Sequence, residues 1–214
     1  IKSKFLYFSS SEIYGDPNLD NIPTDENYRG NVTCQGPRAC YDESKRLGET
    51  LCYVYNTTEN IHTNIIRPFN IYGPGMKEND YRVMPNFANC IKGNKKLKVY
   101  GKGSQTRTFC YITDAMVGFF SVMLNGKNGE TYNIGNHKPE IQMIKLAEMF
   151  IKLSRQTRYV EIVDYPSTYP PDEPNRRVPN IDKAKSDLLY APNVSLEAGL
   201  ERFLNWTSLV YKGN

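Results

Sequence analysis

Short apolar segments with the character of β-strands alternate with helix-like segments through most of this 214-residue chain. Residues 5–9 and 62–67 are strand-like, and residues 39–56 between them carry Leu47 and Leu51 at helical spacing. Alternation of this kind indicates a parallel sheet flanked by helices and argues against a helical bundle or a β-sandwich. We therefore expect an α/β fold.

The alternation continues beyond a turn-rich loop at residues 72–75. Thr113 and Asp114 have the order of an N-cap and an acidic first-turn residue, so we expect a helix to open there. The apolar residues of this helix that we expect to pack in the core are Val117, Phe120, Val122 and Leu124. Further expected elements are helices at 81–91, 141–153 and 196–211, and strands at 97–100, 130–134 and 160–163.

Composition excludes several classes of function. The chain is 39% hydrophobic with a net charge of +4, and its only dense basic run, residues 92–98, has no interleaved stacking aromatics. We therefore expect no nucleic-acid partner. No apolar run reaches the roughly 18 residues of a spanning helix, which predicts no membrane partner. Five cysteines without a C-x-x-C pair argue against a disulfide framework or a metal site and favour a reducing, cytoplasmic setting.

A phenol and an ammonium are expected to lie together at the start of the first helix. Tyr41 and Lys45 are four residues apart, which places their side chains on one face of a helix. A nearby ammonium favours the phenolate, and lowering a phenol pKa from about 10 by about three units corresponds to roughly 4 kcal/mol. The pair could then act as a base, although a Tyr-x-x-x-Lys spacing also arises by chance in a chain this rich in both residues.

Polar residues follow the first strand, where ligands approach a parallel sheet. Ser10 could offer its hydroxyl to a reacting oxygen, and Glu12 adds a carboxylate two residues later. The alternative is that these serines only cap backbone groups. Together with Tyr41 and Lys45 they form a set suited to oxidation and re-reduction of a carbinol.

Four motifs in order carry a family resemblance. The chain resembles extended short-chain dehydrogenases/reductases that act on nucleotide sugars, the NAD-dependent epimerase/dehydratase family. Within that family it is most similar to the UDP-glucuronate decarboxylases, through residues 40–46, 99–107 and 176–181. The four motifs are residues 8–15 (Phe-Ser-Ser-Ser-Glu-Ile-Tyr-Gly), Tyr41-x-x-x-Lys45, residues 67–74 (Arg-Pro-Phe-Asn-Ile-Tyr-Gly-Pro) and residues 107–114 (Arg-Thr-Phe-Cys-Tyr-Ile-Thr-Asp).

The resemblance implies a Rossmann-type parallel sheet flanked by helices, with a small mixed α/β substrate-binding lobe. No Gly-rich dinucleotide-binding turn occurs in the sequence, so we expect the chain to be the C-terminal part of a longer enzyme whose N-terminal Gly-rich half is absent here. Residues 1–70 would be the C-terminal part of the NAD-binding domain. Residues 71–214 would be mainly the sugar-nucleotide lobe, with some segments returning to the first domain.

The resemblance also assigns roles to single residues. Ser10, Glu12, Tyr41, Lys45 and Arg177 would be catalytic, with Tyr41 taking the proton of the 4-hydroxyl and Lys45 lowering its pKa. The cofactor would be NAD, bound by Ser9, Tyr41, Lys45 and Pro68. The substrate, a UDP-sugar, would be bound by Ser11, Asn70, Lys98, Tyr100, Arg107 and Arg177, with Arg107 neutralising the diphosphate through its planar fork.

The subclass depends on Ser11 and Arg177. The related 4,6-dehydratases place an acidic residue where this chain has Ser11, and the decarboxylases place an arginine like Arg177 near the sugar carboxylate. The resemblance therefore implies decarboxylation of UDP-glucuronate to UDP-xylose through a 4-keto intermediate. An inserted loop at residues 28–31 and Asn180 depart from the decarboxylase pattern, so a nucleotide-sugar 4-epimerase or 4,6-dehydratase stays open.

A reading from another class also stays open, namely a non-catalytic sugar-nucleotide-binding subunit, which the missing Gly-rich turn favours. Against it, every residue that the chemistry needs is in place. Relatives pair the helix that carries the Tyr-Lys motif across a dimer interface, and the helix at residues 39–56 has a second apolar stripe. We therefore expect a homodimer.

Overall fold

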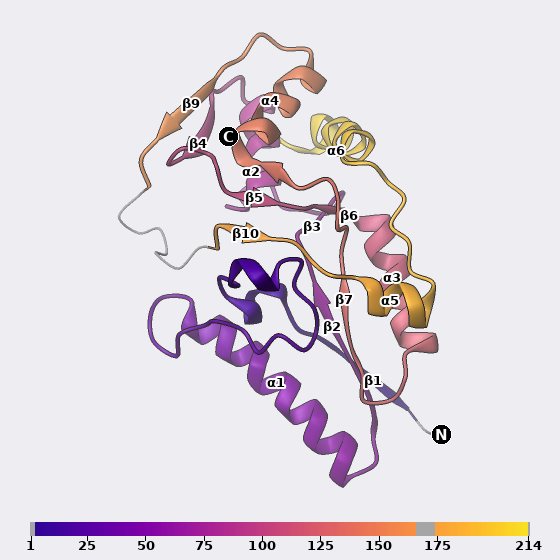
Figure 1. Cartoon of the computed structure of the whole chain (residues 1–214). Helices are drawn as coiled ribbons and strands as arrows, with labels where there is room; N and C mark the ends of the chain where they lie inside the picture. Colours follow the sequence, from indigo (N-terminus) through magenta and orange to yellow (C-terminus); the bar gives the residue numbers. More distant parts are fainter. Residues whose placement is uncertain (1–2, 166–173, 214) are drawn as a thin grey trace.

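The computed structural model describes residues 3–165 and 174–213 and has a parallel three-stranded sheet at its centre (Figure 1). The strands are β1 (Lys4–Phe8), β2 (His62–Pro68) and β7 (Thr131–Ile134), in the order β1-β2-β7. Strand β2 is central and buried over most of its length, including its polar residues Thr63, Asn64 and Arg67. The expected α/β fold with a parallel sheet is therefore confirmed.

Helices cover both faces of this sheet. Helix α1 (Ala39–Thr58) packs against β1 and β2, while α3 (Ile112–Asn125) and α5 (Asp182–Leu188) pack on the other side (Figure 1). Gly48 lets α1 approach closely, because a Cβ atom there would lie 2.1 Å from the Tyr7 hydroxyl oxygen. We call these three strands and three helices the sheet region.

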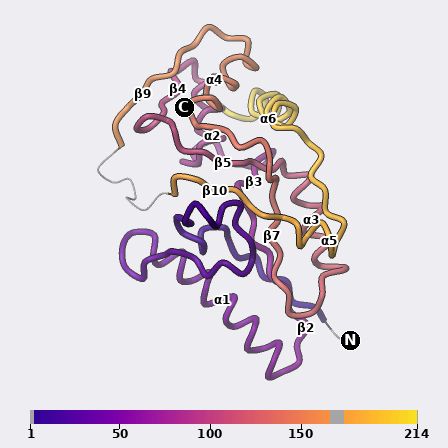
Figure 2. The backbone as a smooth tube through the Cα atoms, viewed as in Figure 1, coloured from indigo at the N-terminus to yellow at the C-terminus, as the bar shows by residue number. Residues whose placement is uncertain are grey.

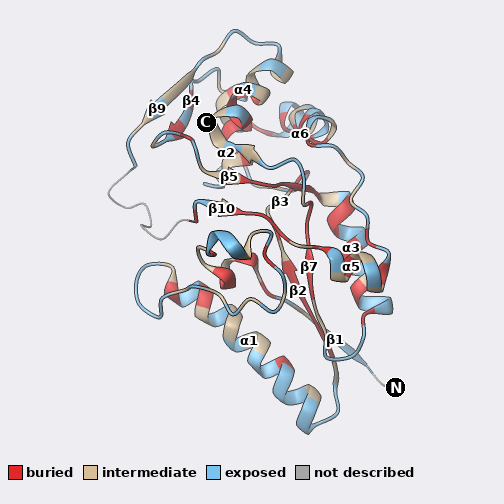
Figure 3. Ribbon diagram, viewed as in Figure 1, coloured by how far each residue is buried: buried red, intermediate tan, exposed pale blue. Residues whose placement is uncertain are grey.

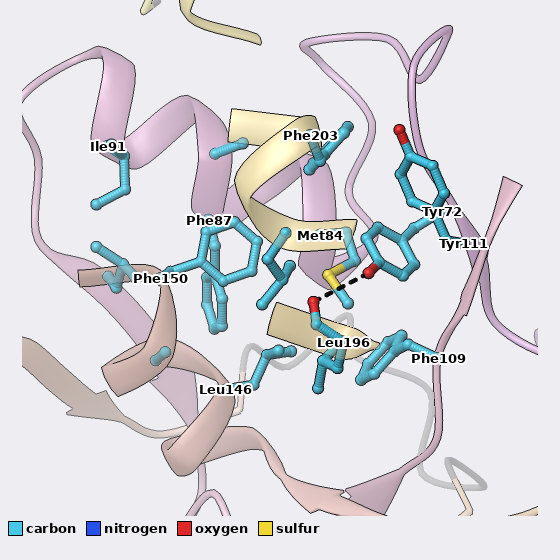
Figure 4. Packing of buried hydrophobic residues seen from close by; sticks show 14 of the residues in the cluster. Tyr72, Met84, Phe87, Ile91, Phe109, Tyr111, Leu146, Phe150, Leu196 and Phe203 are labelled. Atoms are coloured by element: carbon cyan, nitrogen blue, oxygen red, sulfur yellow. Dashed lines mark hydrogen bonds between the residues drawn. The ribbon is translucent and has the colours of Figure 1, made fainter. Parts of the chain in front are cut away.

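Three further helices form the second part of the molecule, which we call the helical region. Its helices α2 (Val83–Lys92), α4 (Met143–Ser154) and α6 (Leu196–Val210) surround an aromatic core (Figure 4). A parallel pair, β4 (Leu97–Tyr100) and β9 (Val160–Val163), lies beside them. Tyr72 donates a hydrogen bond to the Leu196 carbonyl (3.3 Å) inside this core, so its hydroxyl is satisfied although it is buried.

The chain passes between the two regions more than once (Figure 2). It leaves the sheet after β2, returns through α3 and β7, leaves again for α4, and comes back to α5 before ending at α6. Short strands lie along these passages: β3 (Ile71–Tyr72), β5 (Thr106–Arg107), β6 (Cys110–Tyr111), β8 (Ile141–Gln142) and β10 (Arg176–Arg177). The short helices η1 (Ser11–Tyr14) and η2 (Leu19–Asn21) lie between β1 and α1, within the sheet region.

Two expectations about α3 are wrong. The helix begins at Ile112 with Tyr111 at its N-cap, because β6 leads directly into it, and Thr113 already lies in the first turn. Of the four residues expected in the core only Val122 is buried, and the exposed ones are Val117, Phe120 and Leu124. The helix meets the sheet along one face only, through residues such as Ala115 and Gly118, so its remaining apolar side chains point outward.

Other helix boundaries differ from the expected ones by one turn or less. The helix expected at residues 141–153 starts at Met143, because Ile141 pairs antiparallel with Arg107 in a short sheet. Helix α5 was not expected, since seven residues with few apolar positions give a weak periodic signal. Figure 3 shows buried residues concentrated in β2 and β7, whereas the outer side of α1 is exposed, including Leu47 and Leu51.

Candidate functional site

Ser9 and Ser10 lie at the carboxyl end of β1, the edge where parallel sheets bind ligands. The Ser9 amide donates to the Ile66 carbonyl (2.8 Å), which extends the pairing with β2 beyond the strand. The Ser9 side chain is buried, and its hydroxyl has no hydrogen-bond partner among the residues that the structure describes. A buried hydroxyl without a partner is costly, so a ligand that paired with it would be favoured.

Ser10 is the N-cap of the short helix η1, and its hydroxyl oxygen accepts from the Glu12 amide (3.2 Å). The contact uses a lone pair of Oγ and leaves the hydroxyl hydrogen able to donate. Ser11 is buried inside the turn. Capping, the alternative to a chemical role, is therefore what Ser10 does in this structure, but it does not use up the hydroxyl.

Tyr41 and Lys45 lie together in the first turns of α1, as their spacing predicts. The Lys45 ammonium is 5.8 Å from the centroid of the Tyr41 ring and donates to the Phe8 carbonyl (2.8 Å) at the end of β1. This hydrogen bond ties the helix to the strand end that carries Ser9 and Ser10. The Tyr41 side chain is half exposed, so a substrate can reach the phenol.

Glu12 and Arg177 meet although they are far apart in the sequence. Arg177 forms a bidentate pair with the Glu12 carboxylate, Nη1 to Oε1 and Nη2 to Oε2 (2.8 Å), and is itself only 4% exposed. Arg38 donates from Nη2 to the same Oε2. Arg38 in turn lies 4.0 Å from the carboxylate of Asp42, one helical turn later.

Sequence reasoning missed Arg38 and Asp42 as parts of the site. The available signal was local: Arg38 stands three residues before Tyr41 and four before Asp42, a spacing that puts an arginine and a carboxylate on one face at the start of a helix. Spacing alone could not show that the same arginine also reaches Glu12.

Arg107 is buried and lies next to Arg177. The two residues are register partners in the parallel pairing of β5 with β10. Arg107 donates to the carbonyls of Pro174 (2.5 Å), Asn175 (3.2 Å) and Thr106 (2.9 Å). It therefore holds the start of β10 in place, and with it the Arg177 side chain on Glu12.

The other predicted ligand-binding residues are spread over several elements. Pro68 ends β2, and Asn70 follows it with a left-handed backbone (φ 44°) and donates to the Thr108 carbonyl (2.8 Å). Lys98 and Tyr100 lie on β4, in the separate β4-β9 sheet of the helical region. Tyr100 stacks on Tyr165, with ring centroids 5.8 Å apart. The residues brought into direct contact are thus Glu12 and Arg177, and Tyr41 and Lys45.

A second arginine lies close enough to Tyr41 to interact with it electrostatically. Hydrogen bonding to Asp80 raises the pKa of Arg82, and Tyr41 makes a smaller contribution in the same direction. The Arg82 guanidinium pairs with both oxygens of Asp80 (2.5 and 3.0 Å), and the same hydrogen bond lowers the pKa of the Asp80 carboxyl. Arg82 lines a pocket with the Gly73–Gly75 turn and was not predicted.

A buried polar network around Arg67 connects β2 with α1, with β7 and with the loop that follows η1. Arg67 forms a bidentate pair with Glu49 (2.6 and 2.9 Å) and donates to the Tyr14 hydroxyl (2.7 Å). It also donates to the Glu26 carbonyl (2.8 Å), and the Glu26 side chain accepts from the Asn133 amide (2.8 Å) on β7. Burial raises the pKa of the Glu26 carboxyl. The network fixes the loop that follows η1 against the sheet.

Some kinds of site are not found in residues 3–165 and 174–213. There, no group of three or more His, Cys, Asp or Glu residues is arranged to hold a metal ion, and no helix is long and apolar enough to cross a membrane. All five cysteines are free thiols.

Comparison with known proteins gives one consistent group. The family model described as "NAD dependent epimerase/dehydratase family" matches residues 1–135. UDP-glucuronic acid decarboxylase 1 of Danio rerio is 38% identical over 208 residues, which is 97% of this chain and 48% of that protein. UDP-glucuronic acid decarboxylase 1 of Arabidopsis thaliana is 40% identical over 205 residues, 96% of this chain and 45% of that protein. The chain thus spans about half the length of the curated relatives it matches.

Solved structures agree with this group. The crystal structure of UDP-glucuronic acid 4-epimerase from Bacillus cereus, in complex with UDP-glucuronic acid and NAD, is 30% identical with a TM-score of 0.80, over 97% of this chain and 62% of that one. A dTDP-glucose 4,6-dehydratase from Bacillus anthracis, in complex with NAD, is 25% identical with a TM-score of 0.78, over 97% and 62%. These neighbours share the fold around the residues described above.

Proposed function

We propose, from the premise that the chain belongs to the NAD-dependent epimerase/dehydratase family, that it is part of an enzyme that decarboxylates UDP-glucuronate to UDP-xylose. The observation that carries the proposal is the bidentate pairing of Arg177 with Glu12. A buried guanidinium that already binds one carboxylate in this geometry is suited to bind the carboxylate of a uronate substrate as well. The names of the relatives support the same substrate class.

The cofactor of the proposed enzyme is NAD. The fit rests on the buried Ser9 hydroxyl, which has no partner among the described residues, and on the Lys45 ammonium at the end of β1. Ser9, Tyr41, Lys45 and Pro68 would hold the group. When bound, NAD would accept a hydride from C4 of the sugar and return it after decarboxylation, so that no net oxidation occurs.

The chain's own residues would handle the protons and the carboxylate. Tyr41 would take the proton of the 4-hydroxyl with Lys45 favouring the phenolate, and Ser10 would donate a hydrogen bond to the same oxygen. Arg177 would hold the sugar carboxylate beside Glu12. Once C4 is a carbonyl, the bond from C5 to the carboxylate carbon breaks, carbon dioxide leaves, and the electron pair moves onto the 4-oxygen before C5 takes up a proton.

The remaining contacts to the substrate are assigned to residues other than Glu12 and Arg177. Asn70 and Arg107 would contact the diphosphate, Ser11 the sugar, and Lys98 and Tyr100 the nucleoside. Arg107 is also engaged with the carbonyls of residues 174 and 175. A phosphate contact from Arg107 would therefore be added to its role in holding β10. The proposal includes a division of the chain into part of a cofactor-binding domain at residues 1–70 and a mainly substrate-binding lobe at residues 71–214.

A homodimer formed through α1 is part of the proposal. The outward face of this helix carries exposed Leu47, Leu51 and Val54 at helical spacing. A second copy of the chain would cover this stripe. The five free thiols support a reducing, cytoplasmic setting.

The experiment is proton NMR of the complete gene product with NAD and UDP-glucuronate. Growth of UDP-xylose signals with loss of the uronate supports the decarboxylase, and a 4-keto pentose would mean that the return step is absent. Conversion to UDP-galacturonate would instead establish the second candidate, a 4-epimerase, which the likeness to the Bacillus cereus enzyme favours. An unchanged spectrum from folded protein loaded with NAD would overturn both readings in favour of a binding subunit.

A further inference from the structure

Glu12 is held by more guanidinium groups than a single carboxylate needs. Arg177 alone satisfies both oxygens with a bidentate pair, yet Arg38 adds a further hydrogen bond to Oε2. The two arginines come from different elements, β10 and the start of α1. Since a bidentate pair is already a strong arrangement for a carboxylate, the contact from Arg38 needs another explanation.

Among the residues that the structure describes, the carboxylate of Asp42 also lies near the Arg38 guanidinium. Two guanidiniums and two carboxylates alternate in the order Asp42, Arg38, Glu12, Arg177, with Arg38 Nε 4.0 Å from Asp42. Asp42 and Arg177 are buried, while the side chains of Glu12 and Arg38 are each 21% exposed. A carboxylate arriving from solvent would therefore meet Glu12 and Arg38 before it reaches Arg177.

We propose that Arg38 is a positioning residue that retains the Glu12 carboxylate when a carboxylate of the ligand takes over part of the Arg177 guanidinium. The proposal rests on the proposed function, in which the ligand is a nucleotide sugar with a carboxylate on C5. Without Arg38, two carboxylates would compete for one guanidinium, and their mutual repulsion would oppose binding. With Arg38, the Glu12 carboxylate keeps a guanidinium, which it shares with Asp42, when the ligand carboxylate takes over part of Arg177.

The backbone of Arg38 links this arrangement to Tyr41. The Arg38 carbonyl accepts from the amides of Tyr41 (3.0 Å) and Asp42 (3.1 Å), so the residue begins the helix that carries the phenol. Its side chain reaches Glu12 from there. The position of Glu12 is therefore set relative to Tyr41 through one residue. This would hold the sugar carboxylate near Glu12 while the 4-hydroxyl lies at Tyr41.

An arginine suits this position better than a lysine. The planar guanidinium presents Nε toward Asp42 and Nη2 to Glu12 at the same time. A lysine ammonium is a single point charge at the end of a flexible stem, so it would neutralise Glu12 without being fixed by Asp42. Arg38→Lys should therefore keep part of the effect, and Arg38→Met should remove it.

The test is isothermal titration calorimetry of the complete gene product loaded with NAD, with UDP-glucuronate and UDP-xylose as ligands, and with Tyr41→Phe in every protein compared so that UDP-glucuronate is bound without being converted. The two ligands differ by the carboxylate that the proposal concerns. We expect Arg38→Met to raise the Kd of UDP-glucuronate about 10-fold and to change the Kd of UDP-xylose by less than about twofold, with Arg38→Lys in between. The control is Arg29→Met, an exposed arginine of the preceding loop, for which both constants should match those of the protein with Tyr41→Phe alone.

An equal loss of affinity for both ligands in the Arg38 variants would show a merely structural role and overturn the proposal, as would no change for either. If Arg38→Met does not fold, judged by circular dichroism, the charge-preserving Arg38→Lys decides alone by whether it separates the two ligands. Failure of the proposed function is distinguishable, because it appears in the unsubstituted protein as absence of UDP-glucuronate binding or of pentose formation.

Discussion

The helical region and the sheet region use their helices differently. In the helical region α2, α4 and α6 face one another, and Phe87, Phe150 and Phe203 are fully or almost fully buried between them (Figure 4). In the sheet region α1 and α3 lie on opposite faces of one sheet and contact it along a single side. Leu51 and Phe120, on their outer sides, are about half exposed.

The difference follows from the number of neighbours that each helix has. A helix among other helices can bury apolar residues around much of its circumference, whereas a helix on a sheet buries one stripe. Apolar residues outside that stripe stay in solvent unless another surface covers them. The helical region therefore has an internally completed core, and the sheet region carries apolar surface suited to association.

The largest difference between the two regions should appear in the free energy of unfolding when a phenylalanine in each is replaced by alanine. Phe150→Ala, at a fully buried position of α4, should lower the free energy of unfolding of the 214-residue chain by about 3–5 kcal/mol. Phe120→Ala on α3, which is 55% exposed, should cost less than about 1 kcal/mol. Urea unfolding followed by circular dichroism measures both. Similar costs would mean that the outer face of α3 is covered in solution.

Ion pairs should reverse the contrast between the two regions, because here the buried group lies in the sheet region and the exposed one beside the helical region. Arg67→Met in the sheet region leaves Glu49, Tyr14 and a carbonyl without their buried partner and should cost about 3 kcal/mol.

The matched control is Arg82→Met, which removes a guanidinium that is 58% exposed in its pair with Asp80 and should cost less than about 1 kcal/mol. Thermal unfolding of the two variants side by side gives the comparison. A large loss for Arg82 together with a small one for Arg67 would contradict the burial argument.

Association should depend on the sheet region. The double substitution Leu47→Ser with Leu51→Ser on α1 should raise the dimer dissociation constant of the complete gene product about 10- to 100-fold, because apolar residues at the centre of an interface dominate its energy. Sedimentation equilibrium measures this shift. Leu209→Ser on α6 removes an even more exposed leucine from the helical region and should leave the constant unchanged. A protein that is monomeric before substitution would refute the interface.

The smallest effect should come from the buried carboxyl of Glu26. Its pKa is raised by burial above the ordinary value of 4.5, so the folded chain holds the proton more tightly than the unfolded chain. The contribution of Glu26 to stability is then fully present below pH 4.5 and is lost as the pH rises through the folded pKa.

Glu26→Gln keeps an oxygen acceptor for the Asn133 amide but does not ionise. It should therefore raise the melting temperature slightly at pH 7 and leave it nearly unchanged at pH 4. Thermal scans at the two pH values provide the measurement. A stabilisation that is larger at pH 4 would reverse the sign and rule out burial as the cause.

Local patterns in the sequence predicted the fold class, most helices and strands, and the meeting of Tyr41 with Lys45. Each of these depends on residues within one element or on the order of elements. The outward orientation of Phe120 was not predictable in the same way, because helical spacing identifies an apolar face but not what lies opposite it. The cap of α3 was misplaced for a related reason: strand β6 extends to Tyr111 through its pairing with β3.

The sequence by itself determined an α/β chain with a hydroxyl, a carboxylate and a phenol-ammonium pair in order along it. Only the tertiary structure decided that Glu12 lies between Arg38 and Arg177, and that Arg107 holds the strand carrying Arg177. Spacing along a helix or strand fixes neighbours within a few residues, since backbone geometry is local. Contacts between η1, α1 and β10 depend on how separate elements pack, and no local pattern records that.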